Sequence, residues 1–125
     1  MSHPSKILLA EDQTDLREMI ALTLQMAGHQ VTSAPDGGAA LQAAQDFKPD
    51  LIILDIHMPV FDGFQVCEQL RAVQELNKIP IMLMSSLPAE QALATGEQAG
   101  ANEYLRKPFE LNTLIQRVDR LLSAS

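Results

Sequence analysis

Cysteine is nearly absent from this sequence. Only Cys67 is present among 125 residues, so no disulfide can form within the chain. A lone free thiol is typical of a reducing compartment, and we therefore expect a cytoplasmic protein. No run of about 18 apolar residues is present to span a membrane, and residues 1–6 lack the apolar core of a signal peptide. We expect no membrane partner.

Basic residues are also scarce. Lysine and arginine number 9 against 16 aspartates and glutamates, which gives a formal net charge of −7 at pH 7. A domain that binds nucleic acid through a basic face has the opposite balance, so we expect no direct nucleic-acid partner. The acidic balance suits a protein that binds cations or a basic partner surface. Hydrophobic residues make up 46% of the chain, which is ordinary for one globular domain.

Five short apolar runs alternate with longer helical patterns. Three of the runs are continuous rather than alternating, as in strands that a parallel sheet buries on both faces. Five strand–helix units in series predict an α/β domain with three layers and a parallel five-stranded sheet. The predicted strands are residues 7–10, 30–34, 51–54, 79–84 and 101–105, and the predicted helices are about 15–27, 37–47, 64–74, 89–99 and 111–122.

Local signals predict several helix ends. Thr14 is expected to cap the first helix and Asp36 the second. Asp62 is expected to serve the Asp-Gly turn before the third helix. Residues 89–99 contain few large apolar side chains and include Gly96, which costs about 1 kcal/mol relative to alanine in a helix interior. We therefore expect this helix to be weakly anchored and mobile.

Polar side chains follow four of the five predicted strands. Because the carboxyl ends of parallel strands meet at one edge of a sheet, we expect these side chains to share one pocket. Three close carboxylates repel one another, and a bound cation relieves the repulsion. The three histidines fall in separate segments, so oxygen ligands dominate and Mg²⁺ is favoured over Zn²⁺. The residues are Glu11, Asp12, Asp55, Ser85, Ser86 and Lys107.

Such a pocket is suited to phosphoryl transfer. Mg²⁺ usually keeps several waters and binds phosphate oxygens as further ligands. A lysine and a serine can donate hydrogen bonds to the same phosphate. A carboxylate among these groups can attack phosphorus and form an aspartyl phosphate. The protein would contribute mainly positioning and charge neutralisation.

Four motifs in order resemble the receiver domain of two-component response regulators, and the chain is similar to the single-domain chemotaxis type. The motifs are ED at 11–12, LDIHMP at 54–59 with DG at 62–63, SS at 85–86, and GANEYLRKPF at 100–109. Each is a weak signal alone, but all four at predicted strand ends form a specific pattern. The resemblance covers about residues 6–122 and implies a flavodoxin-like (βα)₅ fold with strand order 2-1-3-4-5. We expect one receiver domain over 1–125 with no output domain.

The resemblance implies a role for each polar residue. Asp55 would be the phosphoacceptor, and Lys107 would pair with the phosphoryl group. Ser85 would be the switch hydroxyl, and Tyr104 the aromatic residue that changes rotamer with it. Ser86 would offer a backbone N–H to the phosphate. Mg²⁺, for which Mn²⁺ could substitute, would be bound by Glu11, Asp12, Asp55 and the backbone carbonyl of His57.

The resemblance also implies finer features around the site. The Lys107–Pro108 peptide bond is expected to be cis. His57 and Leu87 occupy positions that vary among receiver domains and flank the path of the attacking water. We expect these two side chains to influence the lifetime of the phosphate.

The implied function is a signalling switch and not a conventional enzyme. A histidine kinase or histidine phosphotransfer protein would donate the phosphoryl group, with Mg²⁺-dependent self-phosphorylation from small phosphodonors and autodephosphorylation besides. The surface of the fourth helix, fifth strand and fifth helix would then change. It would bind a downstream protein, an output domain missing from this chain, or a second copy in a phosphorylation-dependent homodimer.

Two other functions remain open. The first is a receiver-fold interaction module that does not use phosphate, although such modules usually lack one of the acids or the lysine, and all are present here. The second is a Mg²⁺-dependent phosphatase with an aspartyl nucleophile. Phosphatases of that kind generally carry a DxD pair after the first strand and a cap insertion, and this chain shows neither.

Overall fold

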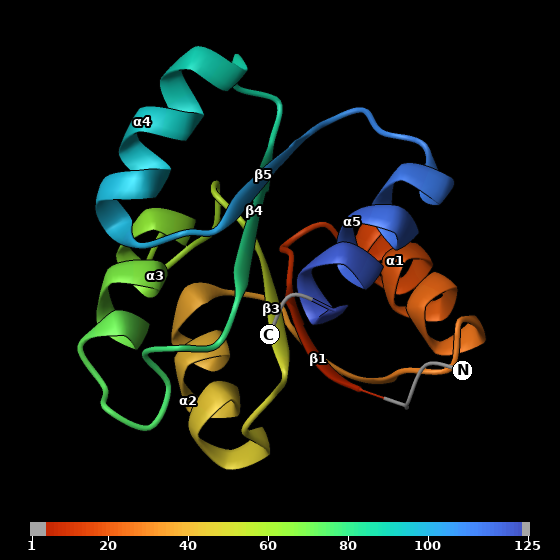
Figure 1. The fold of residues 1–125 in the computed structure, drawn as a ribbon, viewed down its shortest axis with the longest axis horizontal. Helices are drawn as coiled ribbons and strands as arrows, with labels where there is room; N and C mark the ends of the chain where they lie inside the picture. The colour runs from red at the N-terminus through yellow and green to blue at the C-terminus, as the bar shows by residue number, and fades with distance from the viewer. Residues whose placement is uncertain (1–4, 124–125) are drawn as a thin grey trace.

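The computed structural model describes residues 5–123, which form a central parallel sheet between two layers of helices (Figure 1). The sheet has five strands in the order β2-β1-β3-β4-β5, as the resemblance predicted. The elements are β1 (Lys6–Ala10), α1 (Thr14–Met26), β2 (Gln30–Ala34), α2 (Gly37–Phe47), β3 (Leu51–Asp55), α3 (Gly63–Arg71), β4 (Ile81–Ser85), α4 (Ala89–Ala99), β5 (Glu103–Arg106) and α5 (Leu111–Ser123).

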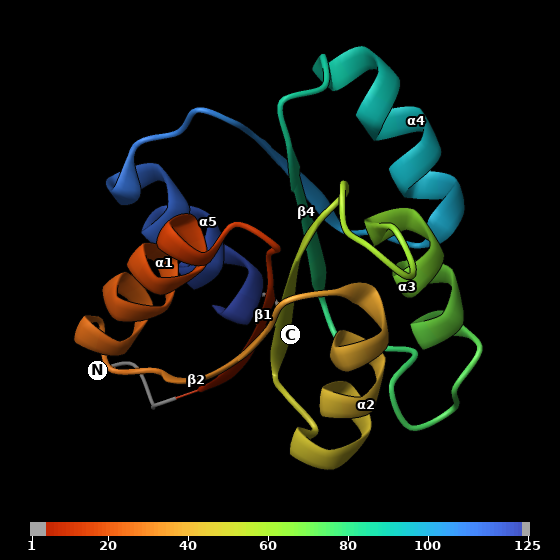
Figure 2. The same cartoon turned by 180° about the vertical axis from the view of Figure 1, so that it is seen from behind.

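The helices divide between the two faces of the sheet. α1 and α5 cover one face, and α2, α3 and α4 cover the other, as the two opposite views show (Figures 1 and 2). Successive residues of β1 point to opposite faces: Leu8 packs in the core under α2 and α3, while Ile7 and Leu9 pack in the core under α1 and α5. This two-sided burial explains why β1, β3 and β4 are continuous apolar runs.

Side-chain caps begin two of the helices. Asp36 accepts a hydrogen bond from the N–H of Ala39 at 2.8 Å, which confirms its predicted capping role. Asp62 and Gln65 form a reciprocal capping box at the start of α3, so Asp62 serves the turn as predicted. Among the described residues, no helix is both long enough and apolar enough to cross a membrane.

The prediction for Thr14 was wrong. α1 starts at Thr14 itself, and Gln13 is the N-cap residue, whose side chain forms no capping hydrogen bond. The Glu11 carboxylate instead accepts the hydrogen bond from the N–H of Gln13 at 3.0 Å. This contact lies within the loop before α1, so the start of α1 has no side-chain cap.

Three element ends differ from the prediction by more than one residue. α3 ends at Arg71, three residues early, and β4 and β5 each start two residues later than predicted. The Arg71 guanidinium donates to the carbonyl oxygens of Asn77 at 3.0 Å and Ile79 at 2.7 Å, and it holds the α3–β4 connection as a turn. Asn102 Oδ1 accepts hydrogen bonds from Arg71 and from the N–H of Ile81, both at 2.8 Å, which ties the starts of β4 and β5 together.

α4 has the predicted bounds and packs through small side chains. Its buried residues are Ala92, Gly96 and Ala99. A Cβ atom at Gly96 would lie 3.2 Å from Leu83 Cδ1, so the glycine allows close approach of α4 to β4. The few large apolar contacts agree with weak anchoring, while the mobility of α4 remains a prediction.

Candidate functional site

Three carboxylates lie together at the carboxyl edge of the sheet. One carboxylate oxygen from each of Glu11, Asp12 and Asp55 lies within 4.8 Å of the other two. Asp55 is the last residue of the buried strand β3, and Glu11 and Asp12 follow β1. Glu11 is 0% exposed and Asp55 is 4% exposed, whereas Asp12 is exposed to solvent. The predicted cluster of acids is therefore present.

A close backbone approach completes the floor of the site. A Cβ atom at Gly63 would lie 2.6 Å from the carbonyl oxygen of Asp55, so no larger residue fits there without a shift. The N–H of Gly63 donates to the carbonyl oxygen of Ile56 at 2.8 Å. These contacts fold the β3–α3 loop back against the end of β3.

Two of the acids are held by hydrogen bonds on both oxygens. Glu11 Oε1 accepts from Lys107 Nζ at 2.7 Å and Glu11 Oε2 from the N–H of Gln13. Asp55 Oδ2 accepts from Lys107 Nζ at 3.1 Å and Asp55 Oδ1 from the N–H of His57 at 3.3 Å. Among the described residues, the Asp12 carboxylate has no hydrogen-bond partner. Asp12 is therefore the acid with both oxygens available.

Lys107 is the ammonium of the cluster, as predicted. Burial lowers the pKa of Lys107, but the hydrogen bond to Glu11 and the negative charge of Asp55 together outweigh burial, so the pKa is raised from its usual value. The lysine is thus held in its charged form. It offsets one of the three carboxylates and leaves two negative charges uncompensated.

The donor set fits a hard divalent cation. The cluster offers carboxylate oxygens only, which suits Mg²⁺ better than Zn²⁺. The two uncompensated negative charges match the charge of one Mg²⁺ ion. The free oxygens of Asp12 could serve as ligands without loss of an existing hydrogen bond.

Ser85 and Tyr104 are connected through the β4–α4 loop. Ser85 is 1% exposed, and its hydroxyl oxygen accepts a hydrogen bond from the N–H of Leu87 at 3.0 Å. The Tyr104 hydroxyl donates toward the carbonyl oxygens of Ser85 at 2.8 Å and Leu87 at 2.5 Å. Tyr104 is 8% exposed, so its ring is directed into the protein. The structure therefore joins the two predicted switch residues by a hydrogen bond.

The other predicted residues lie around this core. His57 is exposed, and its backbone N–H contacts Asp55. Ser86 is exposed beside Lys107 in a groove, which is also lined by Leu16 and Met19 of α1 and by Pro108 and Phe109. The Lys107–Pro108 peptide bond is cis, as expected.

Arg17 is a site contact that the sequence did not predict. Its guanidinium donates to the carbonyl oxygen of Glu11 at 2.8 Å. No motif marks an arginine of α1 as a partner of the preceding loop. Only the helical position of Arg17, one turn after the loop, could have suggested the contact.

Comparisons with known proteins agree on the family. Residues 7–119 match the response regulator receiver domain. The chain is 36% identical over 117 residues to the DNA-binding dual master transcriptional regulator RpaA of Synechocystis sp., covering 94% of this chain and 48% of the relative. It is 38% identical over 117 residues to the transcriptional regulatory protein PrrA of Mycobacterium tuberculosis, covering 94% and 49%. The chain thus spans about half the length of these curated relatives.

Similar solved structures match nearly the whole of both chains. The chemotaxis response regulator CheY4 of Vibrio cholerae has a TM-score of 0.91 and 34% identity, with 95% of this chain and 99% of that chain covered. The Francisella response regulator 1452 receiver domain has a TM-score of 0.89 and 30% identity, with 96% and 98% covered. This protein therefore belongs to the response regulator receiver domain family of two-component systems.

Proposed function

We propose that this chain is a phosphoacceptor signalling switch in which Asp55 receives a phosphoryl group from a histidine kinase or histidine phosphotransfer protein. The observation that carries this proposal is the position of Asp55. A buried strand delivers its carboxylate to the sheet edge, where it contacts Lys107 and lies beside two further acids. An Asp55 oxygen attacks phosphorus, the bond from phosphorus to the donor nitrogen breaks, and that nitrogen keeps the electron pair.

The neighbouring residues would stabilise this transfer. Glu11, Asp12, Asp55 and the backbone carbonyl of His57 would hold Mg²⁺, or Mn²⁺ in its place. The ion, when bound, would neutralise charge on the phosphoryl oxygens. Lys107 already contacts Asp55 at 3.1 Å and would donate to a phosphoryl oxygen, as would the backbone N–H of Ser86.

Ser85 and Tyr104 would pass the change to α4. The Ser85 hydroxyl accepts from Leu87 and still has its own proton to donate to a phosphoryl oxygen. A phosphoryl group adds about −1.5 to −2 charge and three acceptor oxygens, which favours such a contact. Movement of Ser85 would displace the carbonyl groups that hold Tyr104.

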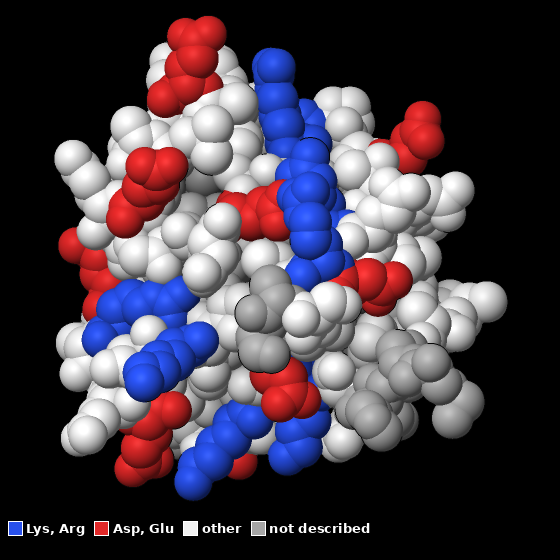
Figure 3. All heavy atoms as spheres, viewed as in Figure 1, with Lys and Arg blue, Asp and Glu red and all other residues white. Residues whose placement is uncertain are grey.

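The face formed by α4, β5 and α5 would be the output surface. Figure 3 shows this face, with basic side chains in a column over β5 and α5 and acidic side chains on α4. Glu103 pairs with Arg117 at 3.0 Å and with Arg120, which links β5 to α5. A downstream protein, an output domain or a second phosphorylated copy would bind here and respond to changes of α4.

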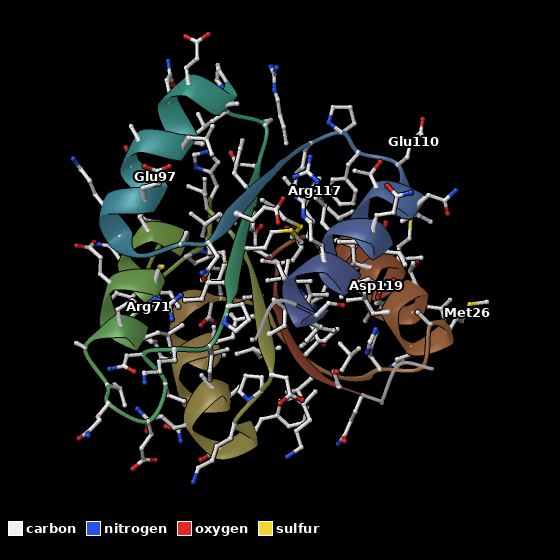
Figure 4. All side chains as sticks on the ribbon, in the orientation of Figure 1. Met26, Arg71, Glu97, Glu110, Arg117 and Asp119 are labelled. Carbon is white, nitrogen blue, oxygen red and sulfur yellow. The ribbon has the colours of Figure 1, made fainter. Side chains whose placement is uncertain are left out.

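A separate apolar surface on α1 would receive the phosphodonor. Met19, Leu22 and Met26 are 46%, 57% and 80% exposed and recur at helical spacing. Figure 4 shows Met26 pointing outward from the end of α1. Near the site, this stripe continues into the groove lined by Lys107 and Phe109. A helical partner lying along α1 would cover this exposed apolar stripe and would at the same time reach Asp55.

One adduct experiment tests the proposal. The protein is incubated with Mg²⁺ and acetyl phosphate, and its intact mass is measured. One phosphoryl adduct is expected in the wild type and in Asp50→Asn, a matched control at the opposite end of β3. No adduct is expected in Asp55→Asn.

Three results would contradict the proposed switch. An adduct that persists in Asp55→Asn would assign the phosphate to another residue. A wild type with no adduct, tested also with beryllofluoride, would favour the phosphate-independent interaction module. Multiple turnover of unrelated phosphomonoesters would instead indicate a phosphatase.

A further inference from the structure

Arg17 contacts the backbone of the loop that carries two of the three carboxylates. Its Nη1 atom lies 2.8 Å from the carbonyl oxygen of Glu11 and 3.5 Å from that of Asp12. Both carbonyl groups belong to the β1–α1 loop, outside the helix that carries Arg17. The contacts therefore fasten α1 to the acidic loop.

Glu11 is held through its backbone on two sides. Its N–H donates to the carbonyl oxygen of Ala34 in β2 at 3.1 Å, and its carbonyl accepts from Arg17. With both groups bonded, the peptide units on either side of Glu11 have little freedom to rotate. β2 and α1 therefore fix the backbone from which the Glu11 side chain reaches Lys107.

The position of the Asp12 carboxylate depends on the loop backbone more strongly than that of Glu11. Its carboxylate bonds to none of the described residues, and its side chain is exposed. Repulsion from Glu11 and Asp55, whose oxygens lie within 4.8 Å, favours rotation away from the cluster. Since no side-chain bond opposes this repulsion, the backbone of the loop must keep Asp12 near the other acids.

We propose that Arg17 is a positioning residue for the metal: by binding the Glu11 and Asp12 carbonyls, it keeps the two carboxylates close enough to share one cation. The inference rests on the proposed Mg²⁺ site. Arg17 does not itself contact the ion. It acts on the loop, as outer groups around metal sites orient the ligands that touch the metal.

The positive charge of Arg17 allows a test based on whether Mg²⁺ affinity rises or falls when the charge is removed. A guanidinium near a cation site repels the cation, so a purely electrostatic role predicts that a neutral substitution strengthens Mg²⁺ binding. A positioning role predicts the opposite, because the loosened loop lets the acids separate. The direction of the change in affinity therefore distinguishes the two roles.

The experiment measures Mg²⁺ affinity by isothermal titration calorimetry without any phosphodonor. Arg17→Gln is expected to weaken binding about tenfold. Arg17→Lys keeps the charge and can donate to one carbonyl, so it should bind Mg²⁺ more tightly than Arg17→Gln and less tightly than the wild type. The matched control is Arg106→Gln, because the Arg106 side chain is exposed on β5 and forms no hydrogen bond or ion pair with the other described residues.

Each outcome decides between the hypotheses. Arg17→Gln binding Mg²⁺ as tightly as the wild type, or more tightly, would overturn the inference. Urea unfolding in EDTA adds a second readout, because a merely structural arginine would lower stability and leave the affinity unchanged. If Arg17→Gln does not fold, Arg17→Lys decides, and an unchanged affinity there overturns the inference. A wild type that binds no Mg²⁺ would instead contradict the proposed metal site.

Discussion

Replacing Asp12 by asparagine should stabilise the metal-free protein. Asp12 has a carboxylate oxygen within 4.8 Å of those of Glu11 and Asp55. At this separation each repulsion costs about 1 kcal/mol in water-like surroundings and about 3 kcal/mol at an effective dielectric of 20. The lower value applies because Asp12 is exposed. Two repulsions therefore amount to about 2 kcal/mol, and the ammonium of Lys107, which bonds both of these acids, offsets part of this sum.

A favourable contribution of Asp12 reduces the expected gain. Asp12 lies just before the N-terminus of α1, where a negative charge contributes about 0.3–1 kcal/mol. The net expectation for Asp12→Asn is thus an increase of at most about 1 kcal/mol in the free energy of unfolding. Asp15→Asn is the matched control, since Asp15 lies in the first turn of α1 and outside the cluster. It should lower stability slightly.

Urea unfolding followed by circular dichroism provides the assay, in EDTA and in saturating Mg²⁺. In the wild type, Mg²⁺ at 100 times its Kd should add about 2.7 kcal/mol to the free energy of unfolding. Asp12→Asn should lose most of this addition. High salt should reduce the stability gain of Asp12→Asn in EDTA, because salt screens exposed charges. A metal-free Asp12→Asn variant less stable than Asp15→Asn would refute the argument from repulsion.

Three further predictions concern residues outside the acid cluster. Val60 is a β-branched residue at φ 73°, a backbone conformation that asparagine adopts more easily. Val60→Asn should therefore raise the free energy of unfolding by about 1 kcal/mol in urea titrations, and a lower free energy of unfolding would contradict backbone strain at Val60. Arg71 donates to the partly buried carbonyls of Gly100 and Ile79, so Arg71→Ala should lower the free energy of unfolding by about 3 kcal/mol in the same titration. A loss below about 1 kcal/mol would show that these hydrogen bonds contribute less than expected. Burial raises the pKa of the Cys67 thiol from 9.0 to about 11. The free energy of unfolding should therefore not depend on this thiol below pH 9.0, and it should fall as the pH rises from 9.0 to about 11, because the thiol ionises more readily in the unfolded chain. Cys67→Ala should lack this alkaline loss in unfolding measured against pH.

The sequence predicted the layers of the fold because burial leaves a direct signal in it. β1, β3 and β4 lie in the middle of the sheet, and their runs are apolar on both faces. β2 and α4 have the predicted bounds, since turn or proline residues flank both. The strand order came from the resemblance to receiver domains and not from periodicity.

Element ends were less predictable where long-range contacts determine them. Nothing near Gln74 in the sequence stops the helical pattern of α3, and the helix ends at Arg71 because that side chain bonds the α3–β4 turn. Arg71 also bonds Asn102 Oδ1, which accepts from the N–H of Ile81 at the start of β4. Contacts between distant segments leave no local pattern.

The same distinction applies to the candidate site. Residue types after parallel strands predicted that Glu11, Asp12, Asp55 and Lys107 would meet, because the topology brings strand ends together. The sequence could not predict how Lys107 divides its hydrogen bonds between two acids. Arg17 was missed for a related reason, since its partners are backbone carbonyls, which every residue type carries.

The position of Tyr104 gives a physical reason why α4 should respond to Asp55. Tyr104 bonds the carbonyl groups of Ser85 and Leu87, and its ring lines a small cavity beneath α4 with Leu83 and Gly96. The N-cap residue of α4 forms no side-chain capping bond, so the start of the helix has few other restraints. A shift of Ser85 toward a phosphoryl group would therefore move the carbonyls that hold Tyr104. The same shift would also release the start of α4. Small side chains and an adjacent cavity make that movement less costly than displacement of a tightly packed helix.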